Sequence, residues 1–287
     1  MNLNDLAKEF AENYMERRLR PSTVRGYRVN LDNHVLPFLG EKEVSRLSVD
    51  DLDDLTEKLL RSLSGKSVVY VHATLRKMLN YALRRGYITV SPYEFFDLPK
   101  VRKYNYQVLT QEQMSTLLTC CKGTPLEIPV TMALYYGLRR GEALGIIPSL
   151  DLDYRSRTLH IQRTRSSEHG QMLLTPCKTE NSDRRILLTQ EHADLLRAHT
   201  HGTDFACPIL PHYLDKQFKK LLAANGLPEI RFHGLRHSYA TFMLSQGVNA
   251  KIVSSTLGHS TVSITLDIYS HPDVSMQIAC LQAMARI

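Results

Sequence analysis

Apolar positions along the first hundred residues recur with the period of a helix. Leu3, Leu6, Phe10 and Tyr14 are spaced by three and four residues, which is the stripe of an amphipathic helix over residues 3–17. Three more helices are expected: one from an N-cap at Ser22 to a stop at Gly40, one after Ser48, and one from about Ser67 to Arg85. Residues 1–97 are therefore predicted to form a helical domain.

The helical period is lost over residues 98–109, LPKVRKYNYQVL. This segment contains a proline and three basic side chains and lacks regular apolar spacing, so it predicts an extended linker between two domains. A new helix begins beyond it, because Thr110 and Gln113 form a capping box. An apolar helix follows from about Leu126 to Leu138.

Alternation of apolar and polar residues then replaces the helical period. Strands are expected over residues 158–161, 172–175 and 185–188, with turns at Ser166 to Gly170 and around Asn181 to Asp183. The rest of the chain reads as helical again. These patterns predict a mainly α fold class with one small antiparallel β-sheet, divided into two domains.

The composition narrows the class of protein. With 287 residues and 43% hydrophobic content the chain can fill a core, and its formal charge of +7, shared by both halves, favours a polyanionic partner. Its 5 cysteines are odd in number and none has C-x-x-C spacing, which favours a reduced cytoplasmic setting without a zinc site. The acidic, amphipathic N-terminus is unlike a signal peptide, and no apolar run approaches membrane-spanning length. We expect no metal and no membrane partner.

A basic stretch in the helical domain is a candidate DNA-binding surface. Between Leu59 and Tyr93 the chain has no aspartate or glutamate, and its basic side chains are Arg61, Lys66, Arg76, Lys77, Arg84 and Arg85. Lys103 in the linker extends the set. Taken alone, such a stretch is more often a solvated helix face whose counter-charges lie elsewhere.

Two basic residues in the second domain are candidates for chemistry. Arg139 directly follows the apolar helix, and an arginine in that place is more often a partner of the helix end or a surface charge than a catalyst. Lys178 lies at the edge of the predicted sheet, where a lysine is usually just solvated. The alternative for Lys178 is a proton donor on a mobile hairpin, because a lysine desolvated near other cations has a lowered pKa. The spacing leaves both alternatives open.

The last candidates come from two segments near the C-terminus. His233 and Arg236 in HGLRH share a helix face, so they can converge on one phosphate. Gly258 is expected to end a helix in the left-handed conformation, with His259 after it and Tyr269 on the next helical stretch. In one continuous helix these last two residues would lie roughly 15 Å apart, so they need a bend or opposite sides of one ligand. A lone tyrosine is more often a packed side chain.

Four separated motifs give the chain a family resemblance. The motifs are, in chain order, GLRRGEALG, the expected hairpin that carries Lys178, HGLRHSYAT and LGHSTVSITLDIYSH. Together they resemble the tyrosine recombinase (phage integrase) family, whose catalytic domain carries these elements in the same order. The resemblance is strong over residues 110–271, and residues 1–97 resemble the family's helical, SAM-like core-binding domain. One departure is Ile146-Ile147-Pro148, where family members often place a tryptophan.

The resemblance implies a role for each candidate. The implied site has two phosphate-clamping arginines, two flanking histidines, a general acid and a nucleophile, which are Arg139 and Arg236, His233 and His259, Lys178, and Tyr269. The tyrosine would form a 3′-phosphotyrosyl intermediate, and the 5′-hydroxyl would leave with a proton from the lysine. Neither ATP nor another cofactor is required by this scheme.

The same resemblance implies the partners. They are double-stranded DNA at attachment or core sites and three further copies of the chain, which form a homotetramer on two duplexes, with room for accessory DNA-bending factors. Residues 272–287 carry an amphipathic helix, for which the resemblance favours docking into a neighbouring protomer and the alternative is packing on its own domain. The expected location is the bacterial cytoplasm or nucleoid.

The biological task stays open among three readings. The first is an integrase that inserts or excises a mobile element, and the LDIYSH ending resembles integrases of phages and conjugative elements. The second is an Xer-like recombinase that resolves chromosome or plasmid dimers. The third, a catalytically silent DNA-binding relative, is disfavoured by the full set of six candidate residues. The core-binding helices start almost at Met1, so the chain is either a simple recombinase or lacks the arm-site domain with which many integrases begin.

Overall fold

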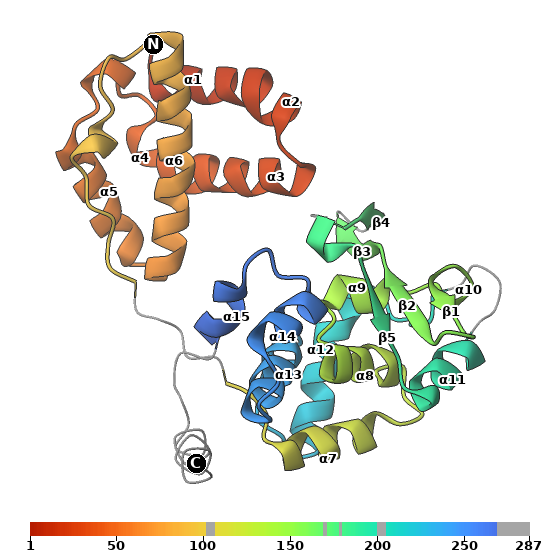
Figure 1. Ribbon diagram of the computed structural model, residues 1–287. Helices are drawn as coiled ribbons and strands as arrows, with labels where there is room; N and C mark the ends of the chain where they lie inside the picture. Colours follow the sequence, from red (N-terminus) through yellow and green to blue (C-terminus); the bar gives the residue numbers. More distant parts are fainter. Residues whose placement is uncertain (102–106, 169–170, 178–179, 200–204, 269–287) are drawn as a thin grey trace, which may run out of the picture. The chain divides into compact units, whose positions relative to one another are not determined.

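A computed structural model describes residues 1–101, 107–168, 171–177, 180–199 and 205–268. The chain divides into two compact units, Met1–Tyr104 and Asn105–Ile287, and the division falls inside the segment 98–109. The first unit is helical, and the second combines helices with small antiparallel sheets (Figure 1). The fold class expected from the sequence is confirmed.

The first unit is built around the long helix α6 (Gly65–Arg85). Helices α1 (Leu3–Phe10), α3 (Pro21–Asn30) and α5 (Val49–Leu60) each contact α6. The apolar side chains of α1, α5 and α6 are buried together in the core of the unit, and partly buried Val24 and Tyr27 of α3 pack against it. Short segments complete the unit: η1 (Ala11–Met15), α2 (Glu16–Arg18), η2 (Leu31–Val35), α4 (Leu36–Leu39), η3 (Val44–Arg46) and η4 (Pro92–Glu94).

Local capping explains where these helices begin. The Ser48 hydroxyl accepts a hydrogen bond from the Asp51 backbone N–H, and the Asp51 carboxylate accepts one from the Ser48 backbone N–H, so α5 starts at the expected place. The prediction of an N-cap at Ser22 is wrong. Pro21 occupies the first position of α3, which suits proline because its φ is fixed near the helical value and its missing N–H would have no helical partner.

The second unit packs its helices around α8 (Glu127–Tyr136), which is almost entirely buried. Helix α8 contacts α7 (Gln111–Cys121), α9 (Arg140–Leu144) and α13 (His233–Ser245). The expected capping box of Thr110 and Gln113 begins α7. The remaining helices are α10 (Pro148–Asp151), α11 (Gln190–Ala198), α12 (Pro211–Ala224), α14 (Ala250–Leu257) and α15 (Val262–Ile268).

The described strands of the second unit form two sheets, not the single sheet expected. Strands β1 (Leu152–Asp153), β2 (Thr158–Ile161) and β5 (Arg184–Leu187) pair antiparallel in the order β1-β2-β5. A separate hairpin pairs β3 (Arg163–Glu168) with β4 (Gln171–Pro176), so the turn predicted to begin at Ser166 is wrong. The sequence of β3, RTRSSE, has no apolar residue, and the alternation that marks a half-buried strand is therefore missing.

Candidate active site

Four of the six candidate residues lie on helix ends of the second unit. Arg139 is the N-cap of α9, His233 and Arg236 occupy the first turn of α13, and His259 follows the end of α14. The ends of α8 and α14 meet here, because a Cβ on Gly137 would lie 2.3 Å from the Leu257 Cδ2 atom.

Three arginines bind three successive carbonyl oxygens at the C-terminus of α14. The Arg184 Nε donates to the Thr256 carbonyl (2.7 Å), the Arg236 Nη2 to the Leu257 carbonyl (2.8 Å), and the Arg139 Nη2 to the Gly258 carbonyl (3.0 Å). The C-terminus of a helix carries partial negative charge and its last carbonyls lack helical partners, so cations are favoured there. The arrangement gathers three guanidinium groups at one place.

Arg236 is the most buried of these arginines, with 1% of its surface exposed. Its Nη1 also donates to the carbonyl of Gly137, the left-handed C-cap of α8 (2.7 Å), so one side chain joins the ends of two helices. Burial, and then the charge of Arg139, lower the pKa of Arg236 to about 9. A buried cation beside a second cation is stabilised by an anionic ligand.

The carboxylate of Glu142 binds two of these arginines, Arg139 and Arg184. Its carboxylate accepts from the Arg139 backbone N–H (2.9 Å) and Nη1 (2.7 Å), and from Arg184 Nη1 (3.2 Å) and Nη2 (3.0 Å). Burial favours its neutral form, but the hydrogen bond and charge of Arg184 and the charge of Arg139 outweigh burial, so the pKa of Glu142 lies below the usual range. Glu142 therefore stays ionised and balances one of the three positive charges.

The histidines of the site are held in the neutral form. Burial, and then the charges of Arg236 and Arg139, lower the pKa of His259 to about 4. Desolvation and the same two charges lower the pKa of His233, which keeps part of its surface open to solvent. His237 lies edge-on to His233, with ring centroids 4.8 Å apart, and burial is the main cause that lowers its pKa to about 4. Each neutral imidazole can donate one N–H without adding charge.

The segment after His259 is fixed by the site itself. Gly258 is in the left-handed conformation (φ 66°), as the sequence predicted, and it separates α14 from α15. The His259 Nδ1 lies 2.8 Å from the Oγ1 of Thr265, which is buried within α15. This contact ties helix α15 (Val262–Ile268) to the site. Tyr269 and Lys178, the proposed nucleophile and acid, lie outside the described residues.

The sequence reading missed two residues of the cluster. Glu142 stands within the GLRRGEALG motif and Arg184 directly follows the turn expected around Asn181 to Asp183, but neither was a candidate for the site. Pairs of arginine and glutamate three residues apart are frequent in helices, so this spacing alone does not identify Glu142 as a residue of the site. The contact between Glu142 and Arg184 spans 42 residues of sequence, and no local pattern predicts it.

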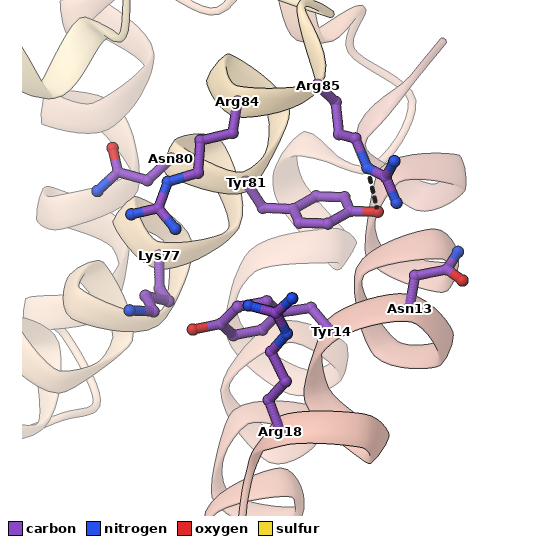
Figure 2. Close-up of a pocket in the computed structure, with 8 residues that line it drawn as sticks. All are labelled: Asn13, Tyr14, Arg18, Lys77, Asn80, Tyr81, Arg84 and Arg85. Atoms are coloured by element: carbon purple, nitrogen blue, oxygen red, sulfur yellow. Dashed lines mark hydrogen bonds between the residues drawn. The ribbon is translucent and has the colours of Figure 1, made fainter.

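Three of the predicted DNA-binding residues line one pocket of the first unit. Lys77, Arg84 and Arg85 come from the second half of α6 and share this pocket (Figure 2). Arg76 instead lies over the ring of Tyr93, with its Cζ 5.9 Å from the centroid. The remaining predicted residues are Arg61, the C-cap of α5; Lys66, in the first turn of α6; and Lys103, which lies outside the described residues.

Among the described residues, no group of three or more histidine, cysteine, aspartate or glutamate side chains is placed to hold a metal ion. No helix in the described part of the chain is long and apolar enough to cross a membrane.

Comparison with known proteins covers both units. The model of the "Phage integrase family" matches residues 107–276, and that of the "Phage integrase, N-terminal SAM-like domain" matches residues 2–60. The tyrosine recombinase XerC of Alcanivorax borkumensis is 30% identical over 272 residues, which are 90% of this chain and 86% of that protein. A XerC-like tyrosine recombinase of Caldanaerobacter subterraneus is 28% identical over 246 residues, which are 72% of this chain but only 63% of that protein.

Solved structures share the fold at lower identity. The integrase of the transposon Tn1549, determined in complex with transposon right end DNA, superposes with a TM-score of 0.84 at 19% identity and covers 99% of this chain and 100% of that one.

Proposed function

This chain belongs to the phage integrase family of tyrosine recombinases, and from that premise we propose that it cuts and rejoins DNA with Tyr269 as nucleophile and with Arg139, Arg236, His233 and His259 as the phosphate site. The observation that carries this assignment is the convergence of these arginines and histidines around the C-terminus of α14. Duplex DNA is the substrate.

The electrostatics of the site suit a phosphodiester under nucleophilic attack. Three guanidinium groups and one carboxylate leave an excess of positive charge, and negative charge grows on the non-bridging oxygens in the transition state. Planar guanidinium groups and neutral imidazoles can stabilise that charge with hydrogen bonds that are already oriented. This description needs no cofactor.

The proposed reaction is a transesterification. The Tyr269 oxygen bonds to phosphorus and its proton passes to a neutral imidazole of the site, while the bond from phosphorus to the 5′ oxygen breaks. Lys178 gives a proton to that oxygen, so a 5′-hydroxyl leaves and a 3′-phosphotyrosyl ester remains. Because the phosphodiester energy is kept in the ester, a 5′-hydroxyl of another duplex can reverse the step and exchange strands.

The proposed assembly is a homotetramer on two duplexes, with residues 272–287 docked into the neighbouring protomer. For the biological task, we favour integration or excision of a mobile element. Resolution of DNA dimers is the second candidate, because the XerC of Alcanivorax borkumensis is 30% identical over most of both chains. Direct repeats in the DNA that flanks the gene would identify an integrated element and favour the first task.

The test of the chemistry is the Tyr269→Phe variant. We expect it to shift DNA carrying the recombination site as the wild type does, and to form no covalent adduct in a denaturing gel. An adduct that persists in Tyr269→Phe would remove this residue from the role of nucleophile.

A further inference from the structure

A pocket of about 330 Å³ lies in the first unit between η1 and the second half of α6. Its lining is polar and basic, with four cationic side chains, two tyrosines and two asparagines, and it contains no carboxylate. The four cations are Arg18, Lys77, Arg84 and Arg85. Cations that share a pocket lined by no carboxylate repel one another, so the pocket is suited to an anion.

Two of these cations, Arg18 and Lys77, lie over the ring of Tyr14. The Arg18 Cζ is 5.7 Å and the Lys77 Nζ is 5.6 Å from its centroid, distances at which a cation is attracted to the ring face. Tyr14 in turn stacks on Phe10 of the core, with ring centroids 5.1 Å apart. The tyrosine is therefore a platform that holds both cationic side chains at the pocket.

The pocket has two ends with different chemistry. At one end Arg85 is engaged within the protein, because its Nε donates to the Tyr81 hydroxyl (3.1 Å) and lies 4.0 Å from the Glu9 carboxylate. At the other end the head groups of Lys77 and Arg84 and the Tyr14 hydroxyl point to the same side (Figure 2). Arg18 and Arg84 are exposed, so this end opens to solvent and a polymer can reach it.

We infer that Arg18, Lys77 and Arg84 together clamp one backbone phosphate of duplex DNA, with Tyr14 as their platform. Guanidinium forks match the oxygens of a phosphate, and an ammonium adds a third donor. The inference rests on the proposed function, which makes duplex DNA the substrate. It adds Arg18 and Tyr14, from the N-terminal segments α2 and η1, to the DNA-binding surface predicted from the basic residues between Leu59 and Tyr93 and Lys103.

The salt dependence of DNA binding tests the clamp. Each neutralised phosphate contributes about 0.9 to the slope of log Kobs against log salt concentration. The full chain is titrated with a duplex of arbitrary sequence at several salt concentrations, and compared with single glutamine variants and with the triple variant Arg18→Gln, Lys77→Gln, Arg84→Gln. We expect the triple variant to lower the slope by about 0.9 in total, because its three side chains share one phosphate.

Arg46→Gln is the matched control. Its side chain is 78% exposed in the same unit and pairs with Glu43, so we expect the slope to stay at the wild-type value. Urea unfolding of each variant verifies that the unit is folded, and we expect unchanged midpoints because none of the replaced side chains is part of the core.

Three outcomes would overturn the clamp. A fall of about 2.7 would mean that each cation meets its own phosphate, and an unchanged slope would mean that none does. Inorganic phosphate is titrated separately, and if it bound the wild type but not the triple variant while the slope stayed unchanged, the ligand would be a free anion.

Failure of the clamp and failure of the proposed function can be distinguished. A wild type that neither binds nor cleaves DNA would contradict the proposed function. A wild type that cleaves DNA normally, together with a triple variant of unchanged slope, would contradict the clamp alone.

Discussion

Glu142 and Arg184 form a buried two-pronged ion pair, in which Nη1 lies 3.2 Å from Oε1 and Nη2 lies 3.0 Å from Oε2. The side chains are 1% and 8% exposed, so the pair is nearly dry. The same carboxylate accepts from Arg139, and Arg184 also holds the Thr256 carbonyl. The pair therefore connects α9, β5 and the C-terminus of α14 next to the proposed phosphate site.

We predict that Glu142→Gln destabilises the protein by about 3–5 kcal/mol, because it leaves the buried Arg184 without a counter-charge. Unfolding in urea measures the change. The exposed pair of Arg140 and Asp215 provides the control, and Asp215→Asn should alter the free energy of unfolding by less than about 1 kcal/mol.

A double variant separates stability from catalysis. Glu142→Met with Arg184→Met removes both charges, and such replacements of buried pairs are often neutral or stabilising, so most of the lost stability should return. DNA cleavage should not return, because Arg139 still lacks its carboxylate. If cleavage recovered with stability, Glu142 would serve the fold only.

Gly258 is the subject of a second prediction. Its φ of 66° lies in the left-handed region, and a Cβ would lie 2.6 Å from the Asn181 carbonyl oxygen. Gly247 has a φ of 77° with nothing within 4 Å of a Cβ, so Gly247→Ala measures the backbone strain alone, about 1–2 kcal/mol. We expect Gly258→Ala to destabilise the protein more than this control and to slow cleavage, since the Gly258 carbonyl holds Arg139. Equal losses in the two variants would show that the clash is relieved without harm.

Local features were the most predictable from the sequence. The helix start after Ser48, the capping box at Thr110 and the left-handed glycine at position 258 are confirmed, because each depends on residues close to one another in the sequence. Pro21 shows the limit of such rules, since Ser22 was expected as the N-cap but proline takes the first helical position and Arg20 is the N-cap.

Features that depend on distant partners were less predictable. Strand β3 was missed because an all-polar strand has no apolar alternation, and it is defined instead by its pairing with β4, most of which was expected as a strand over residues 172–175. The site is similar in kind. Its four described candidates carried individual signals, but the role of the α14 carbonyls as the common anchor of Arg139, Arg184 and Arg236 depends on how distant segments pack.

Lys178 is the subject of a third prediction. If it protonates the leaving 5′ oxygen, Lys178→Ala should slow cleavage by about 10² to 10⁴ and leave DNA binding nearly unchanged. A substrate with sulfur in place of the bridging 5′ oxygen should restore the rate, because a thiolate leaves without a proton. Rates that stay equally low with the sulfur substrate would argue against Lys178 as the acid.

The last prediction concerns the first unit at acid pH. His72 is fully buried, with its Nδ1 2.9 Å from the Tyr93 hydroxyl and its Nε2 2.9 Å from the Thr56 hydroxyl, and burial lowers its pKa to about 4. The unfolded chain takes up this proton near pH 6.5, so the free energy of unfolding should fall between pH 6.5 and 4 by about 1.4 kcal/mol per unit. Urea unfolding at several pH values measures this slope in the wild type and in His72→Gln, with exposed His212→Gln as control. The slope should be smaller in His72→Gln only; if both variants kept the wild-type slope, His72 would not be the group that titrates.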